Sequence, residues 1–268
     1  MSTRETDSET ADVLIVGGGV AGLTAATFTA RAGLDTIVVD TDESILARNA
    51  HLENVPGFPG GINSRRFLDL LAEQADESGA RRETGRVTDV ERSDDGADAF
   101  DVRAVGDGAV GDSDETRVFR TDAVVAASWS DASYLDGLGV ETRDAGSKTY
   151  VVVDELGRTD VEGVYAAGRL TEKYHQAVVA AGHGAEVGLT VVHDSEVPYY
   201  HDWVTPEGYF TDRGREVPPG CEEIDAEERE RRDAASRERT REAFDGPHPE
   251  PQRTHPSLVD DELGRLDE

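Results

Sequence analysis

The sequence predicts an α/β fold with a parallel β-sheet, a β-meander and a C-terminal extension. Three observations support this prediction. A buried-strand pattern at 12–16 leads through a glycine cluster into a helix of small residues and a second buried strand at 36–40. Three strand patterns then follow one another between residues 87 and 126, as in a meander. The composition changes at about residue 196, where an aromatic and then a strongly charged segment begins.

The N-terminal part of the chain, as far as Asp40, is expected to form one βαβ unit behind a short tail. Residues 1–10 are polar, and we predict a disordered N-terminal tail there. Asp12–Val16 is a short apolar run typical of a buried parallel strand. A helix is expected over 23–32, closed by Gly33, and Thr36–Asp40 is the second buried strand.

After a long loop at 41–62, the middle of the chain continues with further predicted helices and strands. A helix is expected over 64–77, with Ser64 as its N-cap. The acidic, glycine-containing stretches 93–98 and 106–115 are expected to be exposed turns of the meander. The remaining elements are expected to be strands at 87–91, 100–105, 118–126, 149–154 and 161–168, and a helix over 176–192.

Residues 196–268 are predicted to extend a domain that occupies 11–195. Aromatic residues gather between Tyr199 and Phe210, where packing against the core or a dimer mate is favoured over a substrate platform. A highly charged helix is expected over 225–244, with Asp225 and Glu228 spaced as in a capping box. The segment 245–268 is predicted to be extended or disordered. We therefore divide the chain into 1–10, 11–195 and 196–268.

The N-terminal glycine cluster is the strongest functional signal. Gly17, Gly19 and Gly22 satisfy G-x-G-x-x-G directly after a strand and at the opening of a helix. Gly17 allows the tight turn, Gly19 lets the backbone approach a pyrophosphate, and Gly22 lets helix and strand pack closely. Asp40 ends the second strand, at the place where a carboxylate accepts hydrogen bonds from a ribose. The pattern predicts dinucleotide binding, and the acid argues against a 2′-phosphate.

A second signal lies between residues 150 and 185. Here the apolar run Tyr150–Asp154 is followed by Arg158–Gly168, a segment that ends in glycine just before a predicted helix. Together with the first motif and the Asn54–Gly60 loop, this resembles the FAD-binding part of thioredoxin-reductase-like flavoproteins, within the pyridine nucleotide–disulfide oxidoreductases. The resemblance covers about residues 11–193. It implies an α/β, three-layer FAD/NAD(P)-binding Rossmann-type domain with a parallel sheet and a β-meander.

The resemblance also implies where FAD is bound. Residues 17–21 would wrap the pyrophosphate, Asp40 would hold the adenosine ribose, and the backbone of Val87 would contact adenine. Asn54 and Gln176 match positions near the flavin ring, and the helix N-terminus at Gln176 would stabilise a reduced, anionic flavin. The predicted cofactor-binding residues are Gly17, Gly18, Gly19, Val20, Ala21, Asp40, Thr41, Asn54, Val87, Gly168, Arg169, Gln176 and Ala177.

Three departures from the family separate this chain from a complete thioredoxin reductase. The last meander strand ends near 126 and the next strand begins near 149, so the connection is too short for the inserted NAD(P)H domain. The sequence has one cysteine, Cys221, and so no CxxC. Arg169 stands where the family has an aspartate on the ribitol. That arginine could pair with the pyrophosphate instead, or it could signal weakened FAD binding.

The sequence therefore predicts an FAD-dependent oxidoreductase with an external electron donor, either NAD(P)H or a redox protein. The alternatives are a non-catalytic FAD-binding interaction or regulatory module and an NAD-binding protein. No catalytic residue is assigned, although His51 or His175 could be a proton donor near the flavin; a surface loop position is equally compatible with either. No histidine pair has convincing ligand spacing, so no metal site is expected. Cys221 is expected to be exposed, and its acidic neighbours are expected to lower the reactivity of its thiol.

The charge excludes other classes of function. Asp and Glu number 57 against 27 Lys and Arg, which gives a net charge of -30, and only Lys148 and Lys173 are lysines. Such a surface repels phosphate backbones and anionic lipids, so neither nucleic acid nor a membrane is an expected partner. The composition resembles that of halophilic proteins; a specific cationic partner is the alternative explanation. No signal-peptide pattern is visible, so we expect a cytoplasmic protein, which could form a homodimer.

Overall fold

The computed structural model describes residues 9–93, 99–106, 116–146 and 148–266. Most of the predicted N-terminal tail and most of both predicted meander turns lie outside these residues. Glu9 and Thr10, which we assigned to the tail, instead belong to β1, because they pair with Phe119 and Arg120 of β6.

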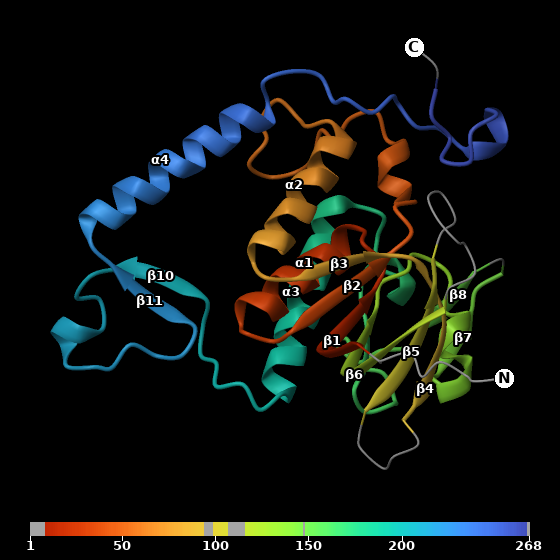
Figure 1. Ribbon diagram of the computed structural model, residues 1–268, viewed down its shortest axis with the longest axis horizontal. Coiled ribbons are helices and arrows are strands. Elements are labelled where there is room, and N and C mark those ends of the chain that lie inside the picture. Colours follow the sequence, from red (N-terminus) through yellow and green to blue (C-terminus); the bar gives the residue numbers. More distant parts are fainter. Residues whose placement is uncertain (1–8, 94–98, 107–115, 147, 267–268) are drawn as a thin grey trace, which may run out of the picture.

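One sheet organises the main body (Figure 1). Its parallel part has the order β3-β2-β1-β6-β9, and β6 also forms the last strand of the antiparallel meander β4-β5-β6. The strand bounds are β1 (Glu9–Val16), β2 (Thr36–Asp40), β3 (Arg81–Thr84), β4 (Arg86–Arg92), β5 (Phe100–Val105), β6 (Thr116–Ala126) and β9 (Val164–Ala166). The α/β prediction with a parallel sheet and a meander is confirmed.

Three helices pack against this sheet, and a fourth lies apart. They are α1 (Val20–Arg31), α2 (Ser64–Glu77), α3 (Ala177–Asp194) and α4 (Ala226–Ala243). The short 3₁₀ segments are η1 (Ile45–Arg48), η2 (Ser133–Leu138), η3 (Gly168–Thr171), η4 (Thr211–Arg213) and η5 (Pro256–Leu258). No helix in the described part of the chain has the length and apolarity that a bilayer crossing requires.

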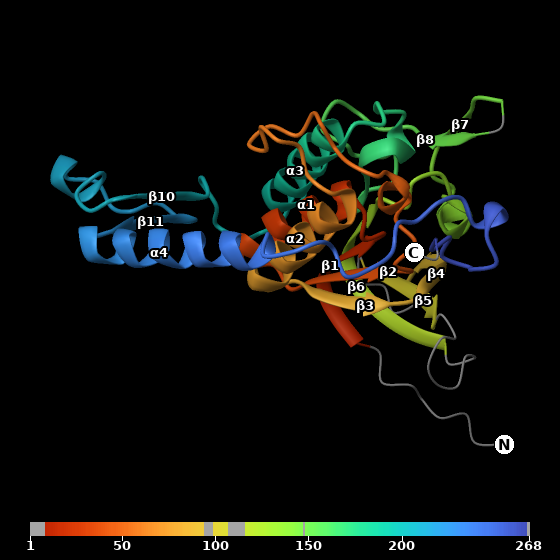
Figure 2. The same cartoon turned by 90° about the horizontal axis from the view of Figure 1, so that it is seen from above.

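Alternation along β1 builds the three layers. Val13 and Ile15 point to one face, where they pack with apolar residues of α1 and α3. Leu14 and Val16 point to the other face and pack with the meander and η2. Because successive strand residues face opposite sides, one short apolar strand contributes to two cores. Figure 2 shows the helices on one side of the sheet and the meander on the other.

Helices α1 and α3 pack unusually closely. A Cβ atom at Gly184 would lie 2.2 Å from the backbone oxygen of Ala21, and one at Gly188 would lie 2.9 Å from that of Ala25. These two glycines are one turn apart on the same face of α3, and therefore they leave room for the backbone of α1. This crossing brings the N-termini of both helices to the same edge of the sheet.

The C-terminal extension has two parts. The first is an arm in which β10 (Trp203–Pro206) and β11 (Cys221–Ile224) form a two-stranded parallel sheet beside α4, projecting from the body in both views (Figures 1 and 2). The charged helix is confirmed, and Asp225 accepts a hydrogen bond from the Glu228 amide at its N-cap. The second part is the segment that follows α4. Outside the extension, a separate hairpin pairs β7 (Thr142–Asp144) with β8 (Thr149–Val151).

Two predicted features need correction. The N-cap of α2 is Asn63, whose side-chain oxygen accepts from the amides of Arg65 and Arg66, while the Ser64 hydroxyl bonds the carbonyl of Asn49. The proline-containing C-terminal segment is not disordered, because residues 248–266 return to the body (Figure 1). Their side chains form hydrogen bonds with residues of the body. The sequence contains no local signal for that return.

Candidate functional site

A cavity of about 500 Å³ opens at the carboxyl edge of the parallel sheet. Strands β1, β2, β6 and β9 all end at this edge. Residues from the loops after β1, β2 and β6 form its wall, together with Arg169 after β9 and the start of α3. Ligands of open parallel sheets bind at this edge, where the strand order reverses. Here β1 lies between β2 and β6, so its glycine loop sits at that reversal.

The glycine loop is shaped to admit a phosphate group. Gly17 has φ +108°, and a Cβ there would lie 2.7 Å from the Ala127 carbonyl oxygen. A Cβ at Gly22 would lie 1.9 Å from the Gly17 oxygen, so the predicted close packing of helix and strand is confirmed. At Gly19 the nearest atom is the Ser44 hydroxyl, 3.9 Å away, which leaves this backbone open toward the cavity. Gly18 instead faces the carboxylate of Asp40.

Helices α1 and α3 both begin at the cavity without a cap of their own. Neither Gly19 nor Gln176 makes a side-chain capping hydrogen bond, and neither helix has an acid in its first turn. Free amides and the partial positive charge of a helix N-terminus attract anions. A pyrophosphate at α1 and an anionic ring edge at α3 would both complement this arrangement, so the residues present fit FAD.

Asp40 lies at the end of the cavity expected to take the adenosine. Its Oδ2 accepts a 3.0 Å hydrogen bond from the Asp42 amide, which fixes the carboxylate. Oδ1 has no hydrogen-bond partner among the described residues, so it is available to a ribose hydroxyl. Thr41 and Val87 line the cavity beside it, as do Val20 and Ala21 at the start of α1.

The opposite end is formed by Gln176, Ala177 and their neighbours. The Asn54 side-chain amide donates a 2.6 Å hydrogen bond to Gln176 Oε1, which brings together two residues 122 positions apart. Gln176 and Ala177 line the cavity, whereas Asn54 supports Gln176 from behind. The resemblance implied only that each of these positions approaches the flavin ring; the hydrogen bond between them is a finding of the folded structure.

Arg169 lines the cavity, but its guanidinium is already held by protein groups. It donates to the Tyr150 hydroxyl and to His175 Nε2, and its Cζ lies 4.6 Å from the centre of the Tyr150 ring. Burial and the nearby Arg169 charge lower the pKa of His175. If Arg169 paired with the pyrophosphate, one of the two roles considered for it, its guanidinium would have to give up its contacts with Tyr150 and His175.

Gly168 does not line the cavity and acts instead through its backbone. Its amide donates a 2.9 Å hydrogen bond to Nδ1 of His183 on α3. His183 is only 5% exposed, and burial lowers its pKa to about 4. The neutral ring thus ties the loop after β9 to α3. Sequence reasoning assigned His183 no role, although its position between Gly182 and Gly184, within the second signal at 150–185, was visible.

Of the three remaining candidate residues, His175, His51 and Cys221, His175 alone lines the cavity. His175 reaches the cavity, but His51 does not and instead pairs with Glu53 at 2.8 Å. The expectation of His51 near the flavin therefore needs correction, because its loop turns the ring toward Gly61. Cys221 is half-buried on β11 and not exposed as expected, because the strand pairing turns its thiol toward the His201 carbonyl.

Several cavity residues escaped the sequence analysis. Trp129 has φ +68°, a left-handed conformation uncommon for a bulky residue, and its ring lies 5.0 Å from that of His175. Residues 43–46 and Arg48 and Asn49, from the loop after Asp40, form another wall. Loop residues of this kind show no periodicity, so their convergence was not visible in the sequence.

Comparisons with known proteins agree with this geometry. Residues 12–50 match the family described as FAD binding domain, and residues 85–184 match the family described as pyridine nucleotide-disulphide oxidoreductase. Thioredoxin reductase of Aquifex aeolicus is 33% identical over 119 residues, which cover 44% of this chain and 33% of that protein. Dihydrolipoyl dehydrogenase of Haloferax volcanii is 27% identical over 237 residues, 84% of this chain and 42% of that protein.

The fold has solved counterparts as well. A thioredoxin reductase from Gloeobacter violaceus superimposes with a TM-score of 0.57 at 19% identity, over 70% of this chain and 96% of that one. The chain spans less than half the length of the two curated relatives described above. These matches support a thioredoxin-reductase-like, FAD-binding oxidoreductase of the pyridine nucleotide–disulfide type, with FAD as the cofactor.

Proposed function

We propose that this oxidoreductase takes electrons from a donor that binds from outside the chain and passes them to a separate acceptor. The observation that carries the proposal is the pairing of one complete dinucleotide cavity with a short connection after β6. From Ala127 to Lys148 the described residues form only η2 and β7, and this connection contains no G-x-G-x-x-G of its own. A donor such as NAD(P)H or a redox protein would therefore have to approach the cavity from outside.

FAD, when bound, supplies the electron-transfer chemistry. The chain's own contribution is to bind and orient it. The open amides at Gly19–Ala21 would hold the pyrophosphate, and Asp40 would accept a hydrogen bond from the ribose. The Asn54–Gln176 hydrogen bond fixes the Gln176 side chain at the start of α3, where the aligned backbone amides of the helix supply a partial positive charge.

His175 is a titratable side chain that reaches this cavity. Its Nε2 accepts from Arg169, so the neutral ring carries its proton on Nδ1. The lowered pKa favours the neutral ring at pH 7, and in that form the Nδ1–H group can donate a hydrogen bond. The Trp129 and His175 rings pack in a T-shaped arrangement, with their centroids 5.0 Å apart. On this basis we propose His175 as a hydrogen-bond donor to a group bound in the cavity, and not as the acid that gives up a proton.

Anaerobic titration of the purified protein tests the donor. NADH and then NADPH are added while the visible flavin absorption is followed, with dithionite as the control for a reducible flavin. Bleaching by a nicotinamide cofactor supports free NAD(P)H as donor. Bleaching by dithionite alone directs the search to a redox protein. A dithionite-reduced flavin that no acceptor reoxidises would favour the alternative of a non-catalytic FAD-binding module.

Thiol chemistry provides a second test. With one cysteine and no CxxC in its 268 residues, the protein by itself is expected not to reduce thioredoxin or a small disulfide with NAD(P)H. Cys221→Ser is the control, since it removes the thiol on the arm. Robust disulfide reduction that survives this substitution would contradict the proposal.

A further inference from the structure

The loop at 41–49 forms one wall of the cavity and begins directly after Asp40. Its own backbone hydrogen bonds are few: the amide of Ala47 bonds the Ser44 carbonyl and that of Asn49 bonds the Leu46 carbonyl, both within the η1 turn. Asp42 has φ +59°, a conformation that costs free energy for a residue with a Cβ. A loop of this kind needs contacts from outside to keep one shape.

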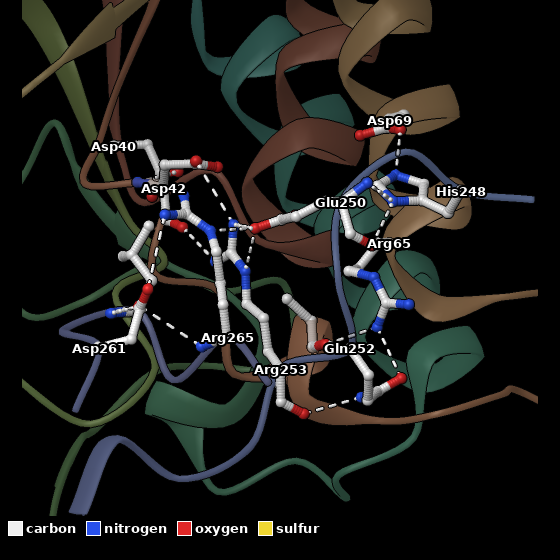
Figure 3. Close-up of polar contacts among 12 residues, drawn as sticks. Asp40, Asp42, Arg65, Asp69, His248, Glu250, Gln252, Arg253, Asp261 and Arg265 are labelled. Carbon is white, nitrogen blue, oxygen red and sulfur yellow. Dashed lines mark hydrogen bonds and ion pairs between the residues drawn. The ribbon is translucent and has the colours of Figure 1, made fainter. Parts of the chain in front are cut away.

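The C-terminal segment 248–266 provides such a contact at the start of the loop. Arg253 is only 6% exposed, and its Nη1 donates a 2.8 Å hydrogen bond to the Asp42 carbonyl (Figure 3). Its Nε donates to Glu250 Oε1 at 2.7 Å, and Glu250 also accepts from Arg265. A buried guanidinium is tolerated only when it is paired and hydrogen-bonded, so Arg253 is held firmly against this carbonyl.

Gln252 makes the matching contact at the far end of the loop. Its side-chain amide donates to the Arg48 carbonyl at 3.2 Å, and its Oε1 accepts from Arg65 Nη1 at 2.7 Å (Figure 3). Arg65 lies on α2 and is 6% exposed. Two adjacent residues of the C-terminal segment therefore hold both ends of the loop, from 204 and 211 positions away in sequence.

The segment itself is folded back on its own chain. Residues Arg253 and Arg265 form an antiparallel bridge, and the Leu266 amide donates to the Gln252 carbonyl at 2.8 Å. Gly264 has φ +73°, and a Cβ there would lie 2.1 Å from the Thr254 oxygen, so this turn requires glycine. His248 ties the segment to Asp69 of α2 at 2.7 Å.

We propose that residues 248–266 form a clamp that holds loop 41–49 in the shape that binds the adenosine half of FAD. Arg253 and Gln252 are the positioning residues of this clamp. The inference rests on the proposed placement of FAD, with its ribose at Asp40. A loop that is already ordered loses less conformational freedom when the ligand binds, so the clamp increases affinity without touching the ligand.

Arg253→Gln in the full-length chain tests this inference. Flavin-free protein is titrated with FAD, with ADP as the probe of the adenosine half and with FMN as the probe of the flavin half. We expect the Kd for FAD and for ADP to rise about tenfold, as expected for the loss of a hydrogen bond to a charged group. The FMN affinity and the flavin midpoint potential should stay unchanged. A purely structural role of Arg253 would not separate the two halves in this way.

Arg239→Gln is the matched control. Arg239 also belongs to the C-terminal extension and pairs with Glu73 and Glu77 of α2, far from the residues that hold the loop. Its FAD and ADP affinities should equal those of the wild type. Equal losses in both variants, or no loss in Arg253→Gln, would overturn the clamp.

Two further measurements keep the test decisive. Arg253→Lys retains the positive charge but lacks the several planar N–H donors of the guanidinium. This variant should fold even if Arg253→Gln does not, and its Kd for FAD should rise by an intermediate amount. Hydrogen exchange of peptides covering 41–49 should accelerate in the Arg253 variants and not in Arg239→Gln. If the wild type binds neither FAD nor ADP, the proposed placement of FAD is wrong as well. Normal FAD binding with unchanged loop exchange rejects the clamp alone.

Discussion

Helices α2 and α4 have N-terminal amides that are capped by a side chain, whereas α1 and α3 have no side-chain cap. Asn63 and Asp225 accept backbone hydrogen bonds at the first pair of N-termini, and α4 also has Glu227 and Glu228 in its first turn. Gly19 and Gln176 make no such bond, and both line the cavity at the carboxyl edge of the sheet. A missing cap costs roughly 1 kcal/mol of helix stability.

The difference shows how the chain separates folding from binding. At the capped helices a protein oxygen already accepts from one amide of α4 and two of α2, so these ends offer fewer free amides to an anion. The uncapped helices keep their amides free at the one edge where a ligand enters, and close packing through Gly184 and Gly188 holds them there. The cofactor would then complete the helix ends that the sequence leaves open.

Filling the open end of α1 should have the strongest effect. Gly19→Val should lower FAD affinity by about 100-fold or more, because the side chain would project where the pyrophosphate has to lie. The apoprotein should remain folded, since Gly19 has φ −78° and only Ser44 lies within 4 Å of a Cβ. Flavin content after purification measures the effect. Gly182→Val is the control, because a Cβ there meets nothing within 4 Å, and equal flavin content in the two variants would reject the site.

The free energy of unfolding should fall in acid because of His183, which holds the loop after β9 through the Gly168 amide. An unfolded histidine has its ordinary pKa of 6.5, whereas His183 in the folded protein has a pKa of about 4. Between these values the unfolded state binds a proton and the native state does not. Stability from this group is therefore complete above pH 6.5 and falls by roughly 2–3 kcal/mol as the pH drops toward 4.

Denaturant unfolding of wild type and His183→Gln across pH 4 to 7 isolates this contribution. Glutamine can still accept from the Gly168 amide but does not titrate. The stability difference between the two proteins should change across this range in favour of the variant at low pH. Parallel pH curves would show that His183 does not carry the effect.

Removing a protein cap should affect folding and not binding. Asp225→Ala is expected to destabilise α4 by roughly 1 kcal/mol, because the Glu228 amide loses its acceptor. Hydrogen exchange in the first turns of α4 should accelerate, while FAD affinity stays constant. A reduced FAD affinity in this variant would mean that the arm and the cavity are coupled, and the comparison between the two kinds of helix end would fail.

The weakest effect should follow when an uncapped end receives an acid. Gln176→Asp places a carboxylate at the N-terminus of α3, where it would compete with negative charge on the reduced flavin. At roughly 0.3–1 kcal/mol, this corresponds to a midpoint potential lower by about 5–20 mV. Gln176→Asn is the matched control, because it has the same size and loses the same contact with Asn54. Equal potentials in both variants would place the flavin ring away from α3.

Features that depend on neighbouring residues could be predicted from the sequence. The βαβ unit follows from two apolar runs around a glycine turn, the position of Asp40 follows from where the second run ends, and the Asp225 cap follows from a three-residue spacing. Each rests on backbone preferences that act within one turn or one strand, so the local pattern carries the information.

Features that join distant segments emerged from the folded chain alone. Strand β3 is polar and becomes a strand because it pairs with β2, and the choice of Asn63 over Ser64 as cap depends on the carbonyl of Asn49. Arg253 reaches Asp42 across 211 positions, and His183 becomes a support for Gly168 only once α3 lies behind the last strand. Such contacts involve polar groups whose partners are set by where the folded chain brings them. A local pattern records which groups can bond, and the fold determines which of them meet.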